Sequence, residues 1–247
     1  MVTKSVRLPR VATPLGPAWP AILATVGQGG ASAGHSHHAM HLVVARGGVI
    51  GVRVGKDEVF APGVLTAPDV PHAIDATDRE VLLVFVDPES TAGLRLQAGM
   101  TASVRALSED ERTAIFAAAS ADVLRWGADA VDRLAGLDPS SRTVHPRVRK
   151  LLKHLQSLPA EGDTSLAALA EIAGLSEGRL AHAFRESVGI PPRLYVLWLK
   201  LQRAALSIVS GESLVRAAAL AGFSDAAHMT RTFRRMFGMA PSALRRT

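Results

Sequence analysis

Two stretches in the last third of the chain, AGLSEGRLAHAFRESVGIPP (173–192) and AGFSDAAHMTRTFRRMFGMAP (221–241), share one pattern. In each, a turn glycine is followed by an apolar residue, a serine, a helical segment with an apolar pair, and then Gly and Pro. The turn glycines, Gly174 and Gly222, are 48 residues apart. Glycine permits the positive φ that a tight turn between helices needs, and the serine can cap the next helix. The pattern therefore predicts two helix-turn-helix units.

The second helix of each unit is predicted to bury one side and expose the other. The pairs Leu180/Phe184 and Met229/Phe233 are spaced i, i+4, so each pair lies on one side of its helix and faces inward. The opposite side then holds Gly178, His182 and Arg185 in the first unit, and Ala227, Thr230, Arg231 and Arg234 in the second. In a helix-turn-helix unit this exposed side is the one that enters the major groove of DNA.

A long helix is predicted to join the two units. Pro191 and Pro192 suit a helix start, and the apolar pattern continues to about Val209. The eighteen residues from Pro192 to Val209 rise roughly 27 Å at 1.5 Å per residue. Successive major-groove segments on one side of a duplex are roughly 34 Å apart. The helix can therefore hold the two units near one turn of DNA apart.

Positive charge is concentrated in the same region. Residues 143–247 carry 15 Lys and Arg against 7 Asp and Glu, whereas residues 1–90 carry 7 against 8 and residues 91–142 carry 6 against 7. Of the 28 basic residues 23 are arginines, whose planar guanidinium suits phosphate oxygens. The last third of the chain is therefore predicted to bind a polyanion.

The first half of the chain has the pattern of short strands. Apolar runs between Ala39 and Val86 are separated by Gly-Gly, Gly-Lys-Asp and Pro-containing turns, which predicts a small all-β sandwich or barrel. Ser108 and Glu111 then form a capping-box signature, and the apolar spacing that follows predicts one or two helices.

The domain boundaries follow from these changes of pattern. The stretch DPSSRT (138–143) is the linker candidate, since it is polar and lies between two helical patterns. We expect a β unit at residues 1–90, helices at 91–142 and a helical domain at 143–247; the family resemblance given next implies that these are a cupin-like sensor barrel, helices for dimerisation and linkage, and a DNA-binding domain.

The C-terminal pattern as a whole resembles a known family. Residues 146–247 resemble the AraC/XylS transcription regulators through LAALAEIAGLS (166–176), RLAHAFRESVGIPPRLY (179–195), LKLQRAAL (199–206), AALAGFSDAAHMTRTFRRMFGMAP (218–241) and SALRR (242–246). The spacing from turn glycine to phenylalanine also fits, at 10 residues in the first unit and 11 in the second. Lys200, Pro191 and Leu244 depart from the family pattern.

The resemblance implies both a fold and a function. It implies an α+β multidomain protein, with an N-terminal cupin-like β-barrel with following helices and a C-terminal all-α domain with two helix-turn-helix units. It implies a ligand-responsive transcription regulator, not an enzyme, that binds double-stranded DNA as a homodimer and contacts RNA polymerase if it is an activator.

The resemblance also implies which residues contact DNA. The full candidate set is Gly178, Arg179, Ala181, His182, Arg185, Ala226, Ala227, Thr230, Arg231, Arg234 and Arg235. We expect phosphate contacts from Arg185, Arg231, Arg234 and Arg235, and a guanine contact from one of these four arginines. We expect contacts with base edges from His182, Ala226, Ala227 and Thr230. Gly178 and Ala181 are small where relatives often carry base-contacting side chains, so we expect the first unit to position more than it specifies.

Five of the nine histidines lie in the β region: four in GHSHHAMHLV (34–43), and His72. Metal-binding cupins carry His-x-His, a carboxylate three or four residues on, and a later P-x-G-x-x-H turn. Against that pattern His41 stands at the carboxylate position, and Ala67 and Asp69 replace Pro and Gly. The candidate metal ligands are His35, His37, His41 and His72, with His38 pointing away. Four imidazoles would suit Zn, Ni, Cu or Fe better than Mg or Ca.

Three interpretations of the histidines stay open on the sequence alone: a divalent transition-metal site, a metal-free small-molecule pocket, or a vestigial site. The second interpretation is favoured, because regulators of this family usually keep the barrel and use its mouth for an organic ligand or for no known ligand. Two other functions compete with a regulator: a metal-dependent cupin enzyme, such as a dioxygenase or isomerase, with an accessory helical domain, and a structural helical protein without DNA affinity. Metal content with turnover, and salt-dependent DNA binding, would separate the three.

The composition of the chain excludes several kinds of site and several classes of protein. The chain lacks cysteine, which excludes disulfides, thiolate metal sites and thiol nucleophiles. With no apolar run near 18 residues, we expect no membrane span. Pro9, Pro14, Pro17 and Pro20 interrupt the apolar stretch that a signal peptide would need, so we expect a cytoplasmic protein. Trp19, Trp126 and Trp198 are expected to be packing residues.

Overall fold

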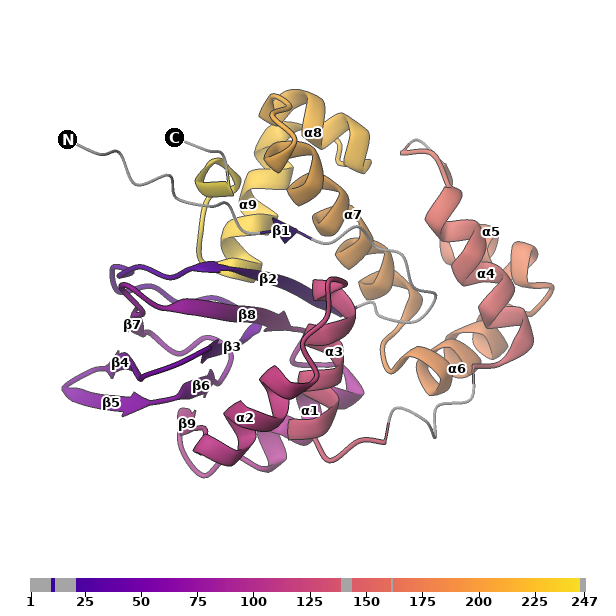
Figure 1. Ribbon diagram of the computed structural model, residues 1–247. Coiled ribbons are helices and arrows are strands. Elements are labelled where there is room, and N and C mark those ends of the chain that lie inside the picture. The colour runs from indigo at the N-terminus through magenta and orange to yellow at the C-terminus, as the bar shows by residue number, and fades with distance from the viewer. Residues whose placement is uncertain (1–9, 12–20, 139–143, 161, 245–247) are drawn as a thin grey trace.

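The computed structural model describes residues 10–11, 21–138, 144–160 and 162–244. The chain has an N-terminal β half, then helices packed on a sheet, and then an all-helical C-terminal half, so the α+β expectation is confirmed (Figure 1). Most of the expected linker, Trp19 and the last two arginines of SALRR lie outside the described residues. Within the described part of the chain, none of the helices combines the length and the apolar composition needed to cross a membrane.

The β half consists of two antiparallel sheets. The larger has the order β1-β2-β8-β3-β6-β9 and the smaller the order β5-β4-β7. The strands of the larger sheet are β1 (Arg10–Val11), β2 (Ile22–Gln28), β3 (Met40–Ala45), β6 (Gly63–Thr66), β8 (Glu80–Val86) and β9 (Val104–Ala106). Those of the smaller are β4 (Ile50–Val54), β5 (Asp57–Ala61) and β7 (Ala73–Asp75).

One strand lies where only helices were expected. β9 falls inside 91–142, and it pairs with β6 through Leu65 opposite Arg105. The sheet therefore extends beyond residue 90, which corrects the expected end of the β unit. The reason is that β6 would otherwise leave the edge of the larger sheet open, and a short strand later in the chain pairs with it.

The sequence of β3 is a run of apolar residues and not an alternating pattern, because both faces of the strand are buried. Met40, Leu42 and Val44 belong to the core between the larger sheet and three helices, whereas Val43 and Ala45 belong to the core between the two sheets. A strand buried on both faces has no polar side. The three helices are α1 (Thr91–Ala98), α2 (Glu109–Ala117) and α3 (Val123–Leu134), and α2 carries the expected Ser108–Glu111 capping box.

The C-terminal half contains the two predicted helix-turn-helix units. Figure 1 shows α4 to α6 at one end of the long helix α7, and α8 and α9 at its other end. The joining helix begins at Pro192 and ends at Val209, as predicted. The elements are α4 (Pro146–Ser157), α5 (Leu166–Ala173), α6 (Glu177–Val188), α7 (Pro192–Val209), α8 (Leu214–Ala221), α9 (Ala226–Phe237) and the 3-10 helix η2 (Pro241–Leu244).

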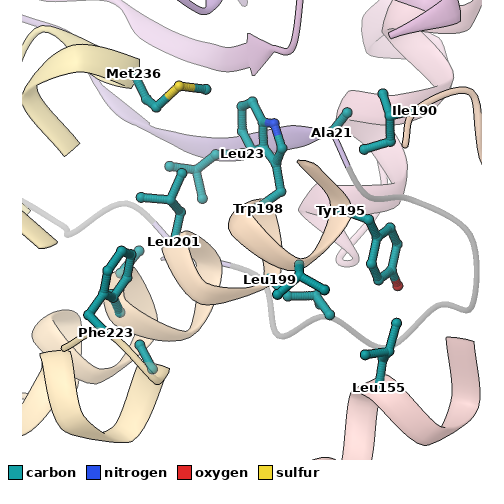
Figure 2. Packing of buried hydrophobic residues seen from close by; sticks show 14 of the residues in the cluster. Ala21, Leu23, Leu155, Ile190, Tyr195, Trp198, Leu199, Leu201, Phe223 and Met236 are labelled. Atoms are coloured by element: carbon teal, nitrogen blue, oxygen red, sulfur yellow. The ribbon is translucent and has the colours of Figure 1, made fainter. Parts of the chain in front are cut away.

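The two halves share one apolar core, and α7 lies at its centre. Trp198 points from α7 toward Ala21 and Leu23 of the β half (Figure 2), and its Nε1–H donates a 2.7 Å hydrogen bond to the buried Oδ2 of Asp87. One turn later the side-chain Nε2–H of Gln202 donates a 2.6 Å hydrogen bond to the backbone carbonyl of Ile22. Trp198 is therefore a packing residue, as expected, that also joins the two halves by a hydrogen bond.

Candidate nucleic-acid interface and histidine cluster

Both helix-turn-helix turns are made by a glycine in the left-handed region. Gly174 ends α5 at φ 64° and Gly222 ends α8 at φ 79°, a conformation that costs side-chain-bearing residues about 1–2 kcal/mol. The helix after the first turn is capped by Ser176, whose side chain accepts from the amide of Arg179. The glycine turn and the serine cap of the first unit therefore agree with the prediction for that unit.

The second unit corrects one detail of the prediction. Its cap is Asp225 and not Ser224: the Asp225 carboxylate accepts from the amide of His228 at 2.6 Å and from the Ser224 hydroxyl at 3.1 Å. Counted from the cap, the buried phenylalanine is eight residues on in both units, at Phe184 and at Phe233. The extra residue of the second unit therefore lies in the turn, and the two reading helices keep the same register.

The candidate DNA-contacting residues all lie on the accessible side of α6 or α9. Leu180 and Phe184 of α6, and Met229 and Phe233 of α9, are fully buried on the inner side, as predicted. The exposed candidates are Gly178, Arg179, His182 and Arg185 on α6 and Ala227, Arg231, Arg234 and Arg235 on α9; Ala181, Ala226 and Thr230 are half-buried. Each reading helix thus presents a continuous surface to solvent.

The helices α6 and α9 differ in charge. One cause is Glu186 of α6, which the sequence analysis did not single out. In α6, Glu177 and Glu186 offset the two arginines, and Glu186 lies 3.2 Å from His182. At the cap-aligned position of α9 stands Arg235, and α9 carries three arginines and no acidic residue. Aligning the two units by their caps would have revealed the difference. Only α9 has the charge that a phosphate backbone attracts strongly.

The histidines of the β half form a cluster. His35, His37 and His72 each offer one ring nitrogen, and these three nitrogens lie within 4.8 Å of one another. The segment before β3 is held beside His72 by a β-bridge, in which the backbone amides of His35 and His72 each donate to the other's carbonyl at 2.9 and 2.8 Å. Residues 37 positions apart in the sequence are thereby brought together.

The three side chains are oriented by the same kind of contact. The Nδ1 atoms of His35, His37 and His72 lie 2.9, 2.7 and 2.8 Å from the carbonyls of Ala33, Ala39 and Val70. A carbonyl accepts only, so each Nδ1 carries a proton, and in a neutral ring of this tautomer the Nε2 presents its lone pair. The Nε2 atoms of His37 and His72 are buried without a hydrogen-bond partner among the described residues.

His41 is not part of this group, which corrects the four-histidine expectation. Its register in β3, opposite Thr66 and Phe85, stacks its ring on Phe85 at 4.6 Å between centroids. It lies beside His37, with ring centroids 5.1 Å apart. His38 lies outside the cluster, as expected, and its Nδ1 is 3.0 Å from the Asp69 carboxylate. Asp69 itself has φ 60°, where the cupin turn has a glycine.

Burial lowers the pKa of two of the clustered imidazoles and of the neighbouring His41. It lowers the pKa of His37 to about 4, against the opposing hydrogen bond to Ala39, and it also lowers the pKa of His72. The pKa of His41 is lowered well below its usual value by its complete burial. Neutral imidazole is the form that binds metal. Three imidazoles whose Nδ1 atoms are fixed by carbonyls match the ligand set of a transition-metal ion.

A cavity of about 520 Å³ lies beside the cluster, between the β half and the second helix-turn-helix unit. Its lining is mostly apolar and includes Phe233 and Phe237 of α9. His35 and His41 line it as well, and so does Thr25, whose buried hydroxyl has no hydrogen-bond partner among the described residues. The cavity can therefore accept a mainly apolar molecule with a polar group.

Comparisons with known proteins agree with the helix-turn-helix geometry. Residues 169–247 match the helix-turn-helix domain family. The probable transcriptional regulator LumQ of Photobacterium leiognathi is 34% identical over 79 residues, which are 32% of either chain. An uncharacterized HTH-type transcriptional regulator of Haemophilus influenzae is 27% identical over 88 residues, which are 35% of this chain and 30% of that one. The chain spans about a third of the length of these curated relatives.

Solved structures include similar chains at low TM-scores. ToxT of Vibrio cholerae is 9% identical, with a TM-score of 0.47, over 90% of this chain and 97% of that chain. A regulator with an AraC-type DNA-binding domain from Chromobacterium violaceum is 27% identical, with a TM-score of 0.38, over 40% of this chain and 89% of that chain.

The two capped units and the sequence matches define residues 169–247 as a helix-turn-helix domain. Over this part of its length, the chain is similar to helix-turn-helix transcriptional regulators.

Proposed function

We propose that the protein regulates transcription by binding duplex DNA at a specific sequence, with α9 reading bases and α6 mainly fixing the position of the complex. The observation that carries the proposal is the exposed face of α9. It holds Arg231, Arg234 and Arg235 on a helix whose other side is buried and whose register is set by Asp225. Arg231 is the proposed guanine contact, because bidentate arginine pairs are the commonest specific contacts in the major groove.

The four other exposed arginines of the reading helices, Arg179, Arg185, Arg234 and Arg235, are the proposed phosphate contacts. Each contact changes the logarithm of the affinity by about 0.9 per logarithmic unit of salt, so four give a slope of about 3.6. Raising the salt concentration from about 50 to about 200 mM should therefore weaken binding about 150-fold. Fluorescence anisotropy with the full chain and duplex DNA measures this slope, and a flat response would refute the proposal.

Specificity is tested separately by selecting bound duplexes from a random DNA pool. A common motif is expected among duplexes selected by the wild type. Arg234→Ala should reduce the salt slope by about 0.9 on every duplex and leave the selected motif unchanged. A selection that yields no motif would leave only unspecific binding to a polyanion and would contradict the regulatory role.

An effector site in the cavity is part of the same proposal. A small, mainly apolar molecule bound there would touch the β half and Phe233 and Phe237 of α9 together. Such a molecule changes DNA affinity only if it binds the two arrangements of the halves unequally. A screen for compounds that raise the melting temperature of the full chain and also change its affinity for the selected duplex tests this role.

The partners and compartment implied by the family resemblance complete the proposal: a cytoplasmic homodimer that contacts RNA polymerase if it activates transcription. The apolar side of α3 is used within the chain, because Leu124, Trp126 and Val131 pack on the larger sheet. A dimer surface on the helices of residues 91–134 would therefore include their outer sides, where Leu94 is exposed. Light scattering of the purified chain, with Leu94→Glu as the comparison, measures the oligomeric state.

A further inference from the structure

We propose that His35, His37 and His72 bind one transition-metal ion through their Nε2 atoms, and that this ion controls how the second reading helix is held against the β half. The proposal rests on the proposed DNA-binding function for its regulatory meaning. The metal site itself rests on the geometry of the cluster alone.

The first step is the fit of the ligands. Three tetrahedral ligands at 2.0–2.1 Å from an ion lie about 3.3 Å from one another. Each histidine offers one ring nitrogen that lies within 4.8 Å of those of the other two, so the widest separation between these three atoms has to close by about 1.5 Å at most, which small side-chain rotations supply. Each Nδ1 is already held by a carbonyl, so binding requires no change of tautomer.

The second step is the set of unsatisfied atoms. His37 and His72 are 3% and 2% exposed, and their Nε2 atoms have no hydrogen-bond partner among the described residues. A buried polar atom left without a partner costs about 1–3 kcal/mol. An ion would satisfy both atoms at once. The imidazole ligands select Zn²⁺, Ni²⁺, Cu²⁺ or Fe²⁺, and not Mg²⁺ or Ca²⁺.

The third step connects the cluster to α9. The two residues that follow His37 donate backbone hydrogen bonds to the last turn of α9: the amide of His38 to the carbonyl of Arg235 at 2.8 Å, and the amide of Ala39 to that of Met236 at 3.1 Å. These bonds satisfy carbonyls that the end of a helix leaves open. The segment that carries two ligands therefore also caps the reading helix.

The end of α9 also lies close to the rings of two of the proposed ligands. Gly238 ends α9 at φ 69°, and a Cβ there would lie 2.6 Å from His35 Cδ2 and 3.0 Å from His37 Cδ2. The rings of both ligands thus touch the helix end directly. An ion that fixes these rings and the 35–39 segment restricts the last turn of α9. It thereby changes the free-energy cost of any rearrangement of the second unit on DNA.

The experiment uses the metal-stripped full chain titrated with Zn²⁺ and Ni²⁺ in a calorimeter. We expect one ion per chain, and a loss of affinity of more than about 100-fold in His37→Ala and in His72→Ala. His38→Ala is the matched control, because His38 is adjacent in sequence and outside the cluster; its affinity should equal that of the wild type. No uptake by the wild type, or equal uptake by His37→Ala, would overturn the site.

The coupling to α9 has its own measurement. Hydrogen exchange of the His38 and Ala39 amides should slow when metal is added to the wild type, and should not respond to metal in His37→Ala. Linkage requires that Zn²⁺ change the affinity for the selected duplex, and that the duplex change the affinity for Zn²⁺ by the same factor, expected to be about 5-fold or more. Unchanged exchange, or equal DNA affinity with and without metal, would overturn the coupling.

The two proposals fail in different ways. DNA binding that is strong with or without metal refutes the control by metal and leaves the DNA-binding function intact. Metal uptake by a chain that binds no DNA refutes the DNA-binding function, and with it the regulatory meaning, while the metal site stands.

Discussion

The hydrogen bond between Trp198 and Asp87 should contribute measurably to the joining of the two halves. Trp198→Phe keeps an aromatic ring in the core but removes the Nε1–H, which leaves the buried Oδ2 of Asp87 without its 2.7 Å donor. Hydrogen bonds to charged groups contribute about 1.5–3 kcal/mol. The smaller ring also leaves unfilled volume at a fully buried position. The expected total loss is about 2–4 kcal/mol of the free energy of unfolding.

Trp126→Phe is the matched control for this prediction. Trp126 is also buried, but its Nε1–H donates 2.8 Å to the neutral carbonyl of Ile115 within the N-terminal half. The two substitutions remove the same atoms, so their packing costs largely cancel. The difference is the charge of the acceptor, since a neutral bond contributes about 0.5–1.5 kcal/mol. Trp198→Phe should therefore be the more destabilising variant by about 1–2 kcal/mol.

Urea unfolding followed by far-UV circular dichroism measures both variants against the wild type. The shared core predicts that the wild-type halves unfold together, and that weakening the contact between them in Trp198→Phe separates their transitions. An equal loss in the two variants, or a loss confined to Trp126→Phe, would refute the assignment of Trp198 as the hydrogen-bonded link between the halves.

Two further predictions concern the helix-turn-helix units. Arg231→Ala should weaken binding to the selected duplex by roughly 1–3 kcal/mol relative to random DNA, whereas Ala181→Gly should leave the sequence preference nearly unchanged; equal losses on both DNAs would make Arg231 a phosphate contact. Gly222→Ala should destabilise more than Gly174→Ala, because its Cβ would lie 2.6 Å from the Ala160 carbonyl oxygen, whereas Gly174 meets only a flexible arginine nitrogen at 3.3 Å. The expected difference is at least about 1 kcal/mol, measured by thermal unfolding; equal melting temperatures would contradict it.

Local features were predictable because they depend on residues three or four positions apart. The turn glycines, the Ser108–Glu111 capping box and the start of α7 at Pro192 all occur where the sequence placed them. The error at the second cap, Asp225 in place of Ser224, also has a local cause. Both residues can cap a helix, and the sequence alone does not say how many residues the preceding turn contains.

The composition of the histidine cluster required the tertiary structure. Strand alternation places His35, His37 and His41 on one side, but the segment before β3 is not a strand, and its bridge to His72 decides which nitrogens converge. His41 follows the register of β3 and stacks on Phe85 instead. Alternation describes a regular strand and cannot give the distance between two segments.

The sequence by itself determined the helix-turn-helix pair, the exposed faces of its second helices and its positive charge, because periodicity, caps and charge are properties of short segments. Only the tertiary structure decided that α7 is joined to the β half through Trp198 and Asp87, and that α9 ends against the histidines. Those contacts join residues more than one hundred positions apart. Their geometry depends on how the strands of the β half and the C-terminal helices pack in the core that the two halves share, which no single segment encodes.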